Sequence, residues 1–142
     1  MINWLPFNGG GLNYDLTHLW PEVWMYTHVG VSGKPDLVYR IRIIYSLHTF
    51  TKGFEPNHDV GFNYADARES RTFCPDRYNK SLQLPQIMKK LDRGHVFHTS
   101  RQNFMRIDNG AGSSYEVFFT VQRSSEVDND LNIYVQLSLI HI

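Results

Sequence analysis

Residues 37–50 read LVYRIRIIYSLHTF, and this stretch decides the fold class. Apolar side chains occupy its odd positions from Leu37 to Leu47, while Arg40, Arg42 and His48 occupy even positions. Alternation with a period of two is typical of a strand with one buried face, whereas a helix needs apolar residues three and four apart. We therefore predict one long strand here, with the two arginines and the histidine on its polar face.

Similar patterns occur on both sides of this stretch. Residues Glu22–Val29 are rich in aromatic and β-branched side chains, and the Gly, Ser and Pro of residues 30–36 indicate a turn. These features predict an antiparallel hairpin with the first strand. Further along, Ser114–Arg123 and Leu131–Ile142 alternate in the same way around a polar turn, which predicts a second hairpin.

Shorter elements lie between the two hairpins. A helix is predicted over Leu84–Arg93, because Pro85 suits a first helical turn and Gly94 suits a stop. Short strands are predicted over Arg71–Cys74, His95–Ser100 and Asn103–Ile107. Residues 51–70 are polar and contain several Gly, Pro and Asn residues, which indicates a long loop.

Together these elements predict an α+β fold. We expect a mostly antiparallel curved sheet of about five or six strands with one or two helices on one face. A small all-β barrel is the alternative. The 142 residues are expected to form a single domain, residues 1–142, in which residues 1–21 are an irregular N-terminal segment.

Composition excludes several classes of protein. Lys plus Arg and Asp plus Glu both number 14, so a formal net charge of zero argues against general electrostatic capture of nucleic acid. The single cysteine, Cys74, excludes a disulfide-built scaffold and a zinc site with several thiolates. Neither a secretory signal nor an apolar run of about 20 residues is visible. A cytoplasmic protein without a membrane partner or cofactor is expected.

Basic and titratable side chains form three candidate groups. Strand alternation places Arg40, Arg42 and His48 on one face, where guanidinium groups could hold a phosphate. The segment DARESRTFCPDRY carries a second group, formed by Arg68, Arg71, Arg77 and Tyr78. This group fits either a local salt-bridge web or a polyanion contact, with Arg71 fixed by its strand.

The third group is the sequence HVFHTSR, which contains His98 and Arg101. The spacing of His95 and His98 suits a metal only on a helix, because residues three apart in a strand point to opposite faces. A strand is expected here, so no metal site is predicted. His98, like His48, remains a candidate general acid or base beside Arg71.

Two segments of the second half carry a resemblance. They are RTFCPDRYNKSLQLPQIMKKL and the later YEVFFTVQRSS and LNIYVQLSLI. They resemble a pattern in short bacterial proteins of accessory genome regions. The layout of a helix before an antiparallel sheet is also similar to the barnase–EndoU–colicin–RelE class of ribonuclease toxins, although this chain lacks the strong positive charge of that class.

Two functions are consistent with these observations. The first is a small binding or interaction protein of a mobile-element or defence context, which acts through an aromatic-rich surface on another protein or on a second copy of itself. The alternative is a metal-independent ribonuclease toxin acting on RNA. In that case Arg40, Arg42, Arg71 and Arg101 would stabilise phosphate charge, and His48 or His98 would move a proton.

Overall fold

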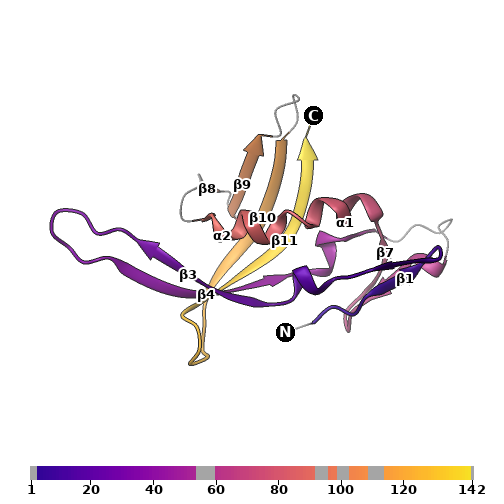
Figure 1. Cartoon of the computed structure of the whole chain (residues 1–142), viewed down its shortest axis with the longest axis horizontal. Coiled ribbons are helices and arrows are strands. Elements are labelled where there is room, and N and C mark those ends of the chain that lie inside the picture. The colour runs from indigo at the N-terminus through magenta and orange to yellow at the C-terminus, as the bar shows by residue number, and fades with distance from the viewer. Residues whose placement is uncertain (1–2, 54–59, 92–95, 99–102, 109–113, 142) are drawn as a thin grey trace.

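The computed structural model describes residues 3–53, 60–91, 96–98, 103–108 and 114–141. Within these residues the fold has one large sheet, two small sheets and two short α-helices (Figure 1). The six strands of the large sheet are, in spatial order, β3 (Glu22–His28), β4 (Leu37–Tyr45), β11 (Leu131–His141), β10 (Ser114–Arg123), β9 (Asn103–Asp108) and β8 (Val96–His98).

The large sheet confirms both predicted hairpins. Strands β3 and β4 pair antiparallel, as do β10 and β11. The two hairpins join through a parallel pair, in which Leu131 of β11 lies opposite Ile41 of β4. The sheet is therefore mixed rather than purely antiparallel. Among the described strands its edges, β3 and β8, do not pair with each other, so an open α+β sheet describes the fold better than a closed barrel.

The N-terminal region is more regular than the predicted irregular segment. Strands β1 (Phe7–Gly9) and β2 (Leu12–Tyr14) form a small hairpin, followed by a 3₁₀ turn, η1 (Thr17–Leu19). Gly10 and Gly11 make the hairpin turn with positive φ angles of 59° and 76°, a conformation that side chains disfavour. Strands of three residues are too short to show a period, so the alternation test could not find them.

The predicted loop 51–70 also contains regular structure. A three-stranded sheet has the order β5 (Thr51–Lys52), β7 (Ser70–Phe73) and β6 (Asn63–Ala65), with a 3₁₀ turn, η3 (Val60–Phe62), before β6. Strand β7 confirms the short strand that the sequence predicted at its position. Both β5 and β6 pair antiparallel with β7. This small sheet positions the turn that follows β6, which is part of the site described below.

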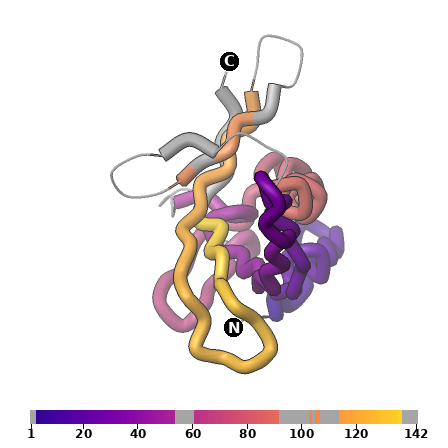
Figure 2. The backbone as a smooth tube through the Cα atoms, turned by 90° about the vertical axis from the view of Figure 1, so that its left-hand side faces the viewer, coloured from indigo at the N-terminus to yellow at the C-terminus, as the bar shows by residue number. Residues whose placement is uncertain are grey.

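Two short helices, α1 (Pro75–Ser81) and α2 (Leu84–Lys89), replace the single predicted helix. Pro75 and Pro85 both lie in first turns, where a missing N–H leaves no bond unmade. The Tyr26 hydroxyl donates to the Met88 carbonyl oxygen, and the Tyr115 hydroxyl donates to the Lys80 carbonyl oxygen at 3.2 Å. These bonds fix the helices on one face of the large sheet, and Figure 2 shows them to one side of the β10–β11 hairpin.

The strand predicted over residues 37–50 ends early, at Tyr45. Residues Leu47–Thr49 form a 3₁₀ turn, η2, and the Ser46 hydroxyl accepts a hydrogen bond from the His48 backbone N–H at 3.2 Å. A serine side chain that bonds to nearby backbone competes with a strand ladder. His48 consequently leaves the strand, and the prediction that it shares a strand face with Arg40 and Arg42 is wrong.

The core lies between the large sheet, the helices and the small sheets. It includes an aromatic cluster in which the rings of Phe7 and Phe73 stack with centroids 4.1 Å apart. The Trp4 and Phe50 rings meet edge to face at 5.3 Å. This cluster explains part of the aromatic excess of the sequence by burial. In the described part of the chain, no helix is long and apolar enough to cross a membrane.

Candidate functional site: a pocket beside the large sheet

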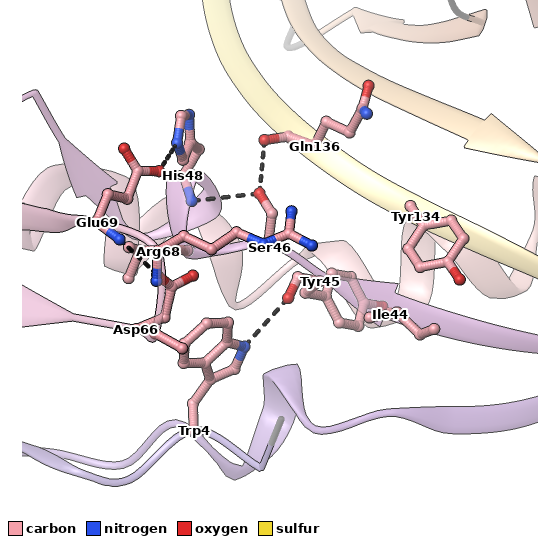
Figure 3. Close-up of a pocket in the computed structure, with 12 residues that line it drawn as sticks. Trp4, Ile44, Tyr45, Ser46, His48, Asp66, Arg68, Glu69, Tyr134 and Gln136 are labelled. Atoms are coloured by element: carbon pink, nitrogen blue, oxygen red, sulfur yellow. Dashed lines mark hydrogen bonds and ion pairs between the residues drawn. The ribbon is translucent and has the colours of Figure 1, made fainter. Parts of the chain in front are cut away.

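A pocket of about 510 Å³ lies where β4 ends and the turn after β6 approaches the large sheet (Figure 3). Its walls come from four parts of the chain, because distant segments meet at this point. The lining residues are Trp4, Ile44, Tyr45, Ser46, Leu47, His48, Asp66, Ala67, Arg68, Glu69, Tyr134 and Gln136.

The apolar wall of the pocket is built by β4 and β11. Ile44 and Tyr134 lie opposite each other in the parallel pair, so their side chains share one face of the sheet. Trp4 closes the pocket from the N-terminal segment, and its indole N–H donates to the Tyr45 carbonyl oxygen at 3.1 Å. Figure 3 shows the rings of Trp4 and Tyr134 on different sides of the pocket. A flat apolar group would fit against this wall.

An irregularity in β11 shapes the same wall. In the β10–β11 register Phe118 lies opposite Leu137 and Phe119 lies opposite Val135, so Gln136 has no partner in β10. The carbonyl oxygen of Gln136 instead accepts a hydrogen bond from the Ser46 hydroxyl at 2.7 Å. Bulges of this kind redirect a strand next to functional sites.

The polar side of the pocket is the turn Asp66–Glu69. The Asp66 carboxylate accepts the backbone N–H groups of Arg68 and Glu69 at 2.8 and 2.9 Å. Burial by itself raises the pKa of Asp66, but these two bonds and the Arg68 charge outweigh it and hold that pKa below its usual value. Asp66 is therefore ionised at neutral pH and fixes the turn that carries Arg68.

His48 and Arg68, both predicted as functional from the sequence, meet in this pocket. The His48 Nε2 atom bonds to a carboxylate oxygen of Glu69. The Arg68 side chain extends from the turn across the pocket toward Ser46 (Figure 3). Within the described residues, no hydrogen bond or ion pair of the Arg68 guanidinium group is found. The pocket thus contains an exposed cation between aromatic walls.

Arg40 and Arg42 lie elsewhere, beside the turn that joins β10 to β11. The Arg40 guanidinium contacts Asp130 at 3.2 Å, and Arg42 contacts both Glu126 and Asp128. The turn between β10 and β11 carries three acidic residues, and the structure pairs the two arginines with them. Phosphate binding at Arg40 and Arg42 would have to compete with these carboxylates.

Arg71, Arg77 and Tyr78 bind backbone or side-chain groups of the protein itself. The Arg71 Nε donates to the Thr51 hydroxyl at 2.8 Å, and Arg77 donates to the Thr51 carbonyl oxygen at 2.6 Å. Burial lowers the pKa of Arg71, and the neighbouring charge of Arg77 adds to that effect. The Tyr78 hydroxyl donates to the Asp15 carbonyl oxygen at 2.9 Å.

The remaining sequence candidates cannot be placed. Arg101 lies outside the described residues, and for His98 only the backbone of β8 is described.

Sequence reasoning missed Trp4, Tyr134 and Gln136, which come from segments far apart in the chain. The pattern Asp-x-Arg-Glu at residues 66–69 is one that could have suggested an Asx turn. Within the described residues, no three His, Cys, Asp or Glu side chains gather as a metal site.

Comparisons with known proteins place the chain in a family. The chain is 31% identical over 103 residues to Protein YjaZ of Escherichia coli (strain K12), an alignment that covers 67% of this chain and 58% of that protein. The chain therefore spans less than two thirds of this relative. No solved structure matches it. The resemblance to bacterial proteins extends beyond the second half of the chain, whereas the toxin class finds no support in these matches. Residues 6–138 match the model of the YjaZ family, and the chain belongs to that family.

Proposed function

We propose that this protein is a binding protein that takes a small organic anion in the pocket between His48, Arg68 and Tyr134. The observation that carries the proposal is the Arg68 guanidinium group, which lies in a pocket of about 510 Å³ without a described protein partner. A carboxylate or phosphate group of the ligand would bind Arg68, and a flat apolar body would lie against Ile44 and Tyr134.

The guanidinium groups of the other candidate arginines support this choice. Arg40 and Arg42 are paired with carboxylates, while Arg71 and Arg77 are bonded to Thr51. Arg68 differs because no hydrogen bond or ion pair of its guanidinium group is found among the described residues, although its charge acts on the neighbouring Asp66 carboxylate. The fork of N–H donors on a guanidinium group matches two oxygens of a carboxylate or phosphate.

The walls of the pocket favour an organic anion over an inorganic one. The rings of Trp4 and Tyr134 and the aliphatic chain of Ile44 supply apolar surface to the pocket. Ligand sites commonly combine such walls with a few placed polar groups that fix the orientation of the ligand. A ligand with an anionic end and an aromatic or alicyclic body satisfies both sides.

The ribonuclease alternative has less support from the geometry. It requires several arginines and one histidine in a common cleft. Among the described side chains, Arg40 and Arg42 lie at the β10–β11 turn, Arg71 lies at Thr51, and only Arg68 joins His48 in the pocket.

Isothermal titration with benzoate, phenyl phosphate and neutral benzamide tests the proposal. Benzoate or phenyl phosphate should bind the wild-type protein, and benzamide should bind at least about tenfold more weakly, because a charge-assisted bond contributes roughly 1.5–3 kcal/mol. Arg68→Gln should weaken binding of the anions by a similar factor. Arg123→Gln, an exposed arginine at the end of β10, is the matched control and should bind like wild type.

Equal binding by wild type and Arg68→Gln would contradict the proposal, as would equal binding of benzoate and benzamide. Cleavage of a single-stranded RNA by the wild-type protein, abolished in His48→Ala, would favour the ribonuclease instead.

A further inference from the structure

The β3–β4 hairpin extends beyond the rest of the sheet as a two-stranded arm (Figure 1). Strand β11 pairs with β4 only from Ile41 onward, so residues Leu37–Arg40 of β4 pair with β3 alone among the described strands. We call residues 23–39 the arm. It carries apolar side chains on both faces, and its most exposed ones are Met25 at 61%, Val29 at 68%, Val31 at 71%, Leu37 at 49% and Val38 at 51%.

The turn of the arm is ordered rather than loose. The Asp36 carboxylate accepts the Gly30 backbone N–H at 2.8 Å. A Cβ atom on Gly30 would lie 1.9 Å from the Lys34 carbonyl oxygen, so only glycine fits there. A hairpin with such a defined turn holds its exposed apolar residues in a fixed position, which is a property of docking elements.

Strand β3 is one edge of the large sheet, and beyond Glu22 at its start it carries none of the charges, prolines or bulges that protect such edges. Its sequence EVWMYTH contains no Lys, Pro or Gly, and its seven residues pair with β4 without a bulge. Edge strands of folded proteins are normally interrupted by charges, prolines or bulges, because an unprotected edge recruits another strand. Met25 and Trp24 remain 61% and 38% exposed on its two faces.

We propose that β3 pairs with β3 of a second copy of this chain, antiparallel and with the two-fold axis at Met25. In this register Met25 lies opposite itself, Trp24 opposite Tyr26, and Val23 opposite Thr27. Glu22, which Lys89 of its own chain already contacts at 2.9 Å, then lies opposite His28, so the acidic end of each strand meets the histidine of the other. The two large sheets become one continuous sheet across the dimer.

Charge and aromatic pairing favour this register over its neighbour. A two-fold axis at Trp24 would place Glu22 opposite Tyr26 and leave His28 without an acidic partner. The axis at Met25 instead joins Trp24 and Tyr26 as a cross-strand aromatic pair, an arrangement that stabilises sheets. The formal net charge of zero means that two copies do not repel each other at long range.

Residues beyond the strand fit the same arrangement. Continuing the register places Val29 opposite Pro21 of the second copy and Gly30 opposite Trp20. Trp20 is 39% exposed and Val29 is 68% exposed, so the pairing covers apolar surface on both chains. The proposed dimer contacts involve no residue of the Arg68 pocket, so the dimer is independent of the proposed function.

Sedimentation equilibrium across a range of protein concentrations tests the dimer. The wild-type protein should show a monomer–dimer equilibrium, and Met25→Lys should raise the dissociation constant at least about tenfold, because two lysines would face each other at the axis. Val127→Lys, at a position 94% exposed in another turn, is the matched control and should leave the constant unchanged. His28→Glu should weaken the dimer, whereas His28→Lys should preserve it.

Disulfide trapping tests the register directly. In a Cys74→Ser background, Met25→Cys should give a covalent dimer under mild oxidation, because opposed residues of antiparallel strands have Cα atoms about 4.5–5.5 Å apart, within disulfide range. His28→Cys should not, because six residues separate it from Glu22, a distance of roughly 20 Å along a strand. The proposal is wrong if the wild-type protein stays monomeric at all concentrations, if Met25→Lys dimerises like wild type, or if His28→Cys crosslinks in preference to Met25→Cys.

Discussion

The indole N–H of Trp4 donates a hydrogen bond to the Tyr45 carbonyl oxygen at 3.1 Å, across 41 positions of the chain. Trp4 is 4% exposed and packs edge to face on Phe50. One side chain therefore anchors the N-terminal segment to the end of β4 and also lines the pocket.

Removal of this bond should destabilise the fold. Trp4→Phe retains an aromatic ring but leaves the buried carbonyl without this donor, which costs about 1–3 kcal/mol. Urea denaturation should show the loss as a lower midpoint at unchanged slope. Trp24→Phe is the control, since Trp24 is 38% exposed and its change should cost less. Equal losses in the two variants would show that the Trp4 bond is not an anchor.

The second prediction concerns Thr51, which is fully buried. Its hydroxyl donates to the Leu47 carbonyl oxygen at 2.7 Å and accepts from Arg71 at 2.8 Å. Thr51→Val removes both bonds with little change of shape and should cost about 1–3 kcal/mol of unfolding free energy. Thr51→Ser keeps the hydroxyl and loses about 0.8 kcal/mol through its missing methyl group. If chemical denaturation gives Thr51→Ser a lower unfolding free energy than Thr51→Val, this role of the hydroxyl is disproved.

Stability should also fall between neutral and mildly acidic pH because of His18. Burial lowers the pKa of His18 below its usual value of about 6.5, and the opposing charge of Asp15 does not outweigh it. The folded state therefore binds fewer protons, so its stability is complete above the unfolded pKa and declines as pH falls through that value. His18 lies 2.9 Å from the Ser81 hydroxyl, beside α1.

The melting temperature at pH 7.5 and at pH 5.5 measures this effect. The difference between the two values should shrink in His18→Gln and persist in His28→Gln, where the exposed histidine of the arm is changed. A wild-type difference that survives unchanged in His18→Gln would assign the pH dependence to another group.

A more acidic pH range should reveal the pair of Arg40 and Asp130. The Arg40 side chain bonds to Asp130 and lowers the pKa of that carboxyl, with a further bond from the Arg40 backbone N–H. A carboxyl whose pKa is lower in the folded state stabilises the fold at pH values above its unfolded pKa of about 3.9. That stabilisation is lost as the pH falls toward the folded pKa. Asp130→Asn should thus be less stable than wild type at pH 7 and converge with it in acid.

A double-mutant cycle checks the assignment of that pair. Arg40→Gln should lower stability less in the Asp130→Asn background than in wild type, because the two changes remove the same interaction. Strictly additive losses would show that the carboxyl owes its stabilising effect to other groups.

The sequence predicted those elements whose signal is local. Period-two alternation found the main part of β4 and located β10 and β11 closely, since apolar residues recur at alternate positions along each of these strands. It failed at Ser46, where a side-chain bond to the backbone of His48 ends the strand. The hydrogen bonds of a single serine hydroxyl do not alter the alternation of apolar residues, so the pattern could not predict this strand end.

The candidate site could be predicted only in part, for the same reason. His48 and Arg68 were identified as chemically useful residues, but their meeting depends on the small sheet that pairs β6 with β7. Tyr134 joins them because β11 pairs in parallel with β4, a contact between residues 90 positions apart in sequence. Parallel pairing of this kind has no local signature, whereas a hairpin is marked by its turn.

The central position of β11 has a consequence for how the protein is made. Of the described strands, β11 leaves the ribosome last, yet it lies between β4 and β10 in the middle of the large sheet. Until it arrives, the nascent chain exposes the inner edges of both neighbours, and such edges promote aggregation. Chains that terminate before Leu131 lack the strand that unites the two hairpins, so they should depend on chaperones and be removed by proteases.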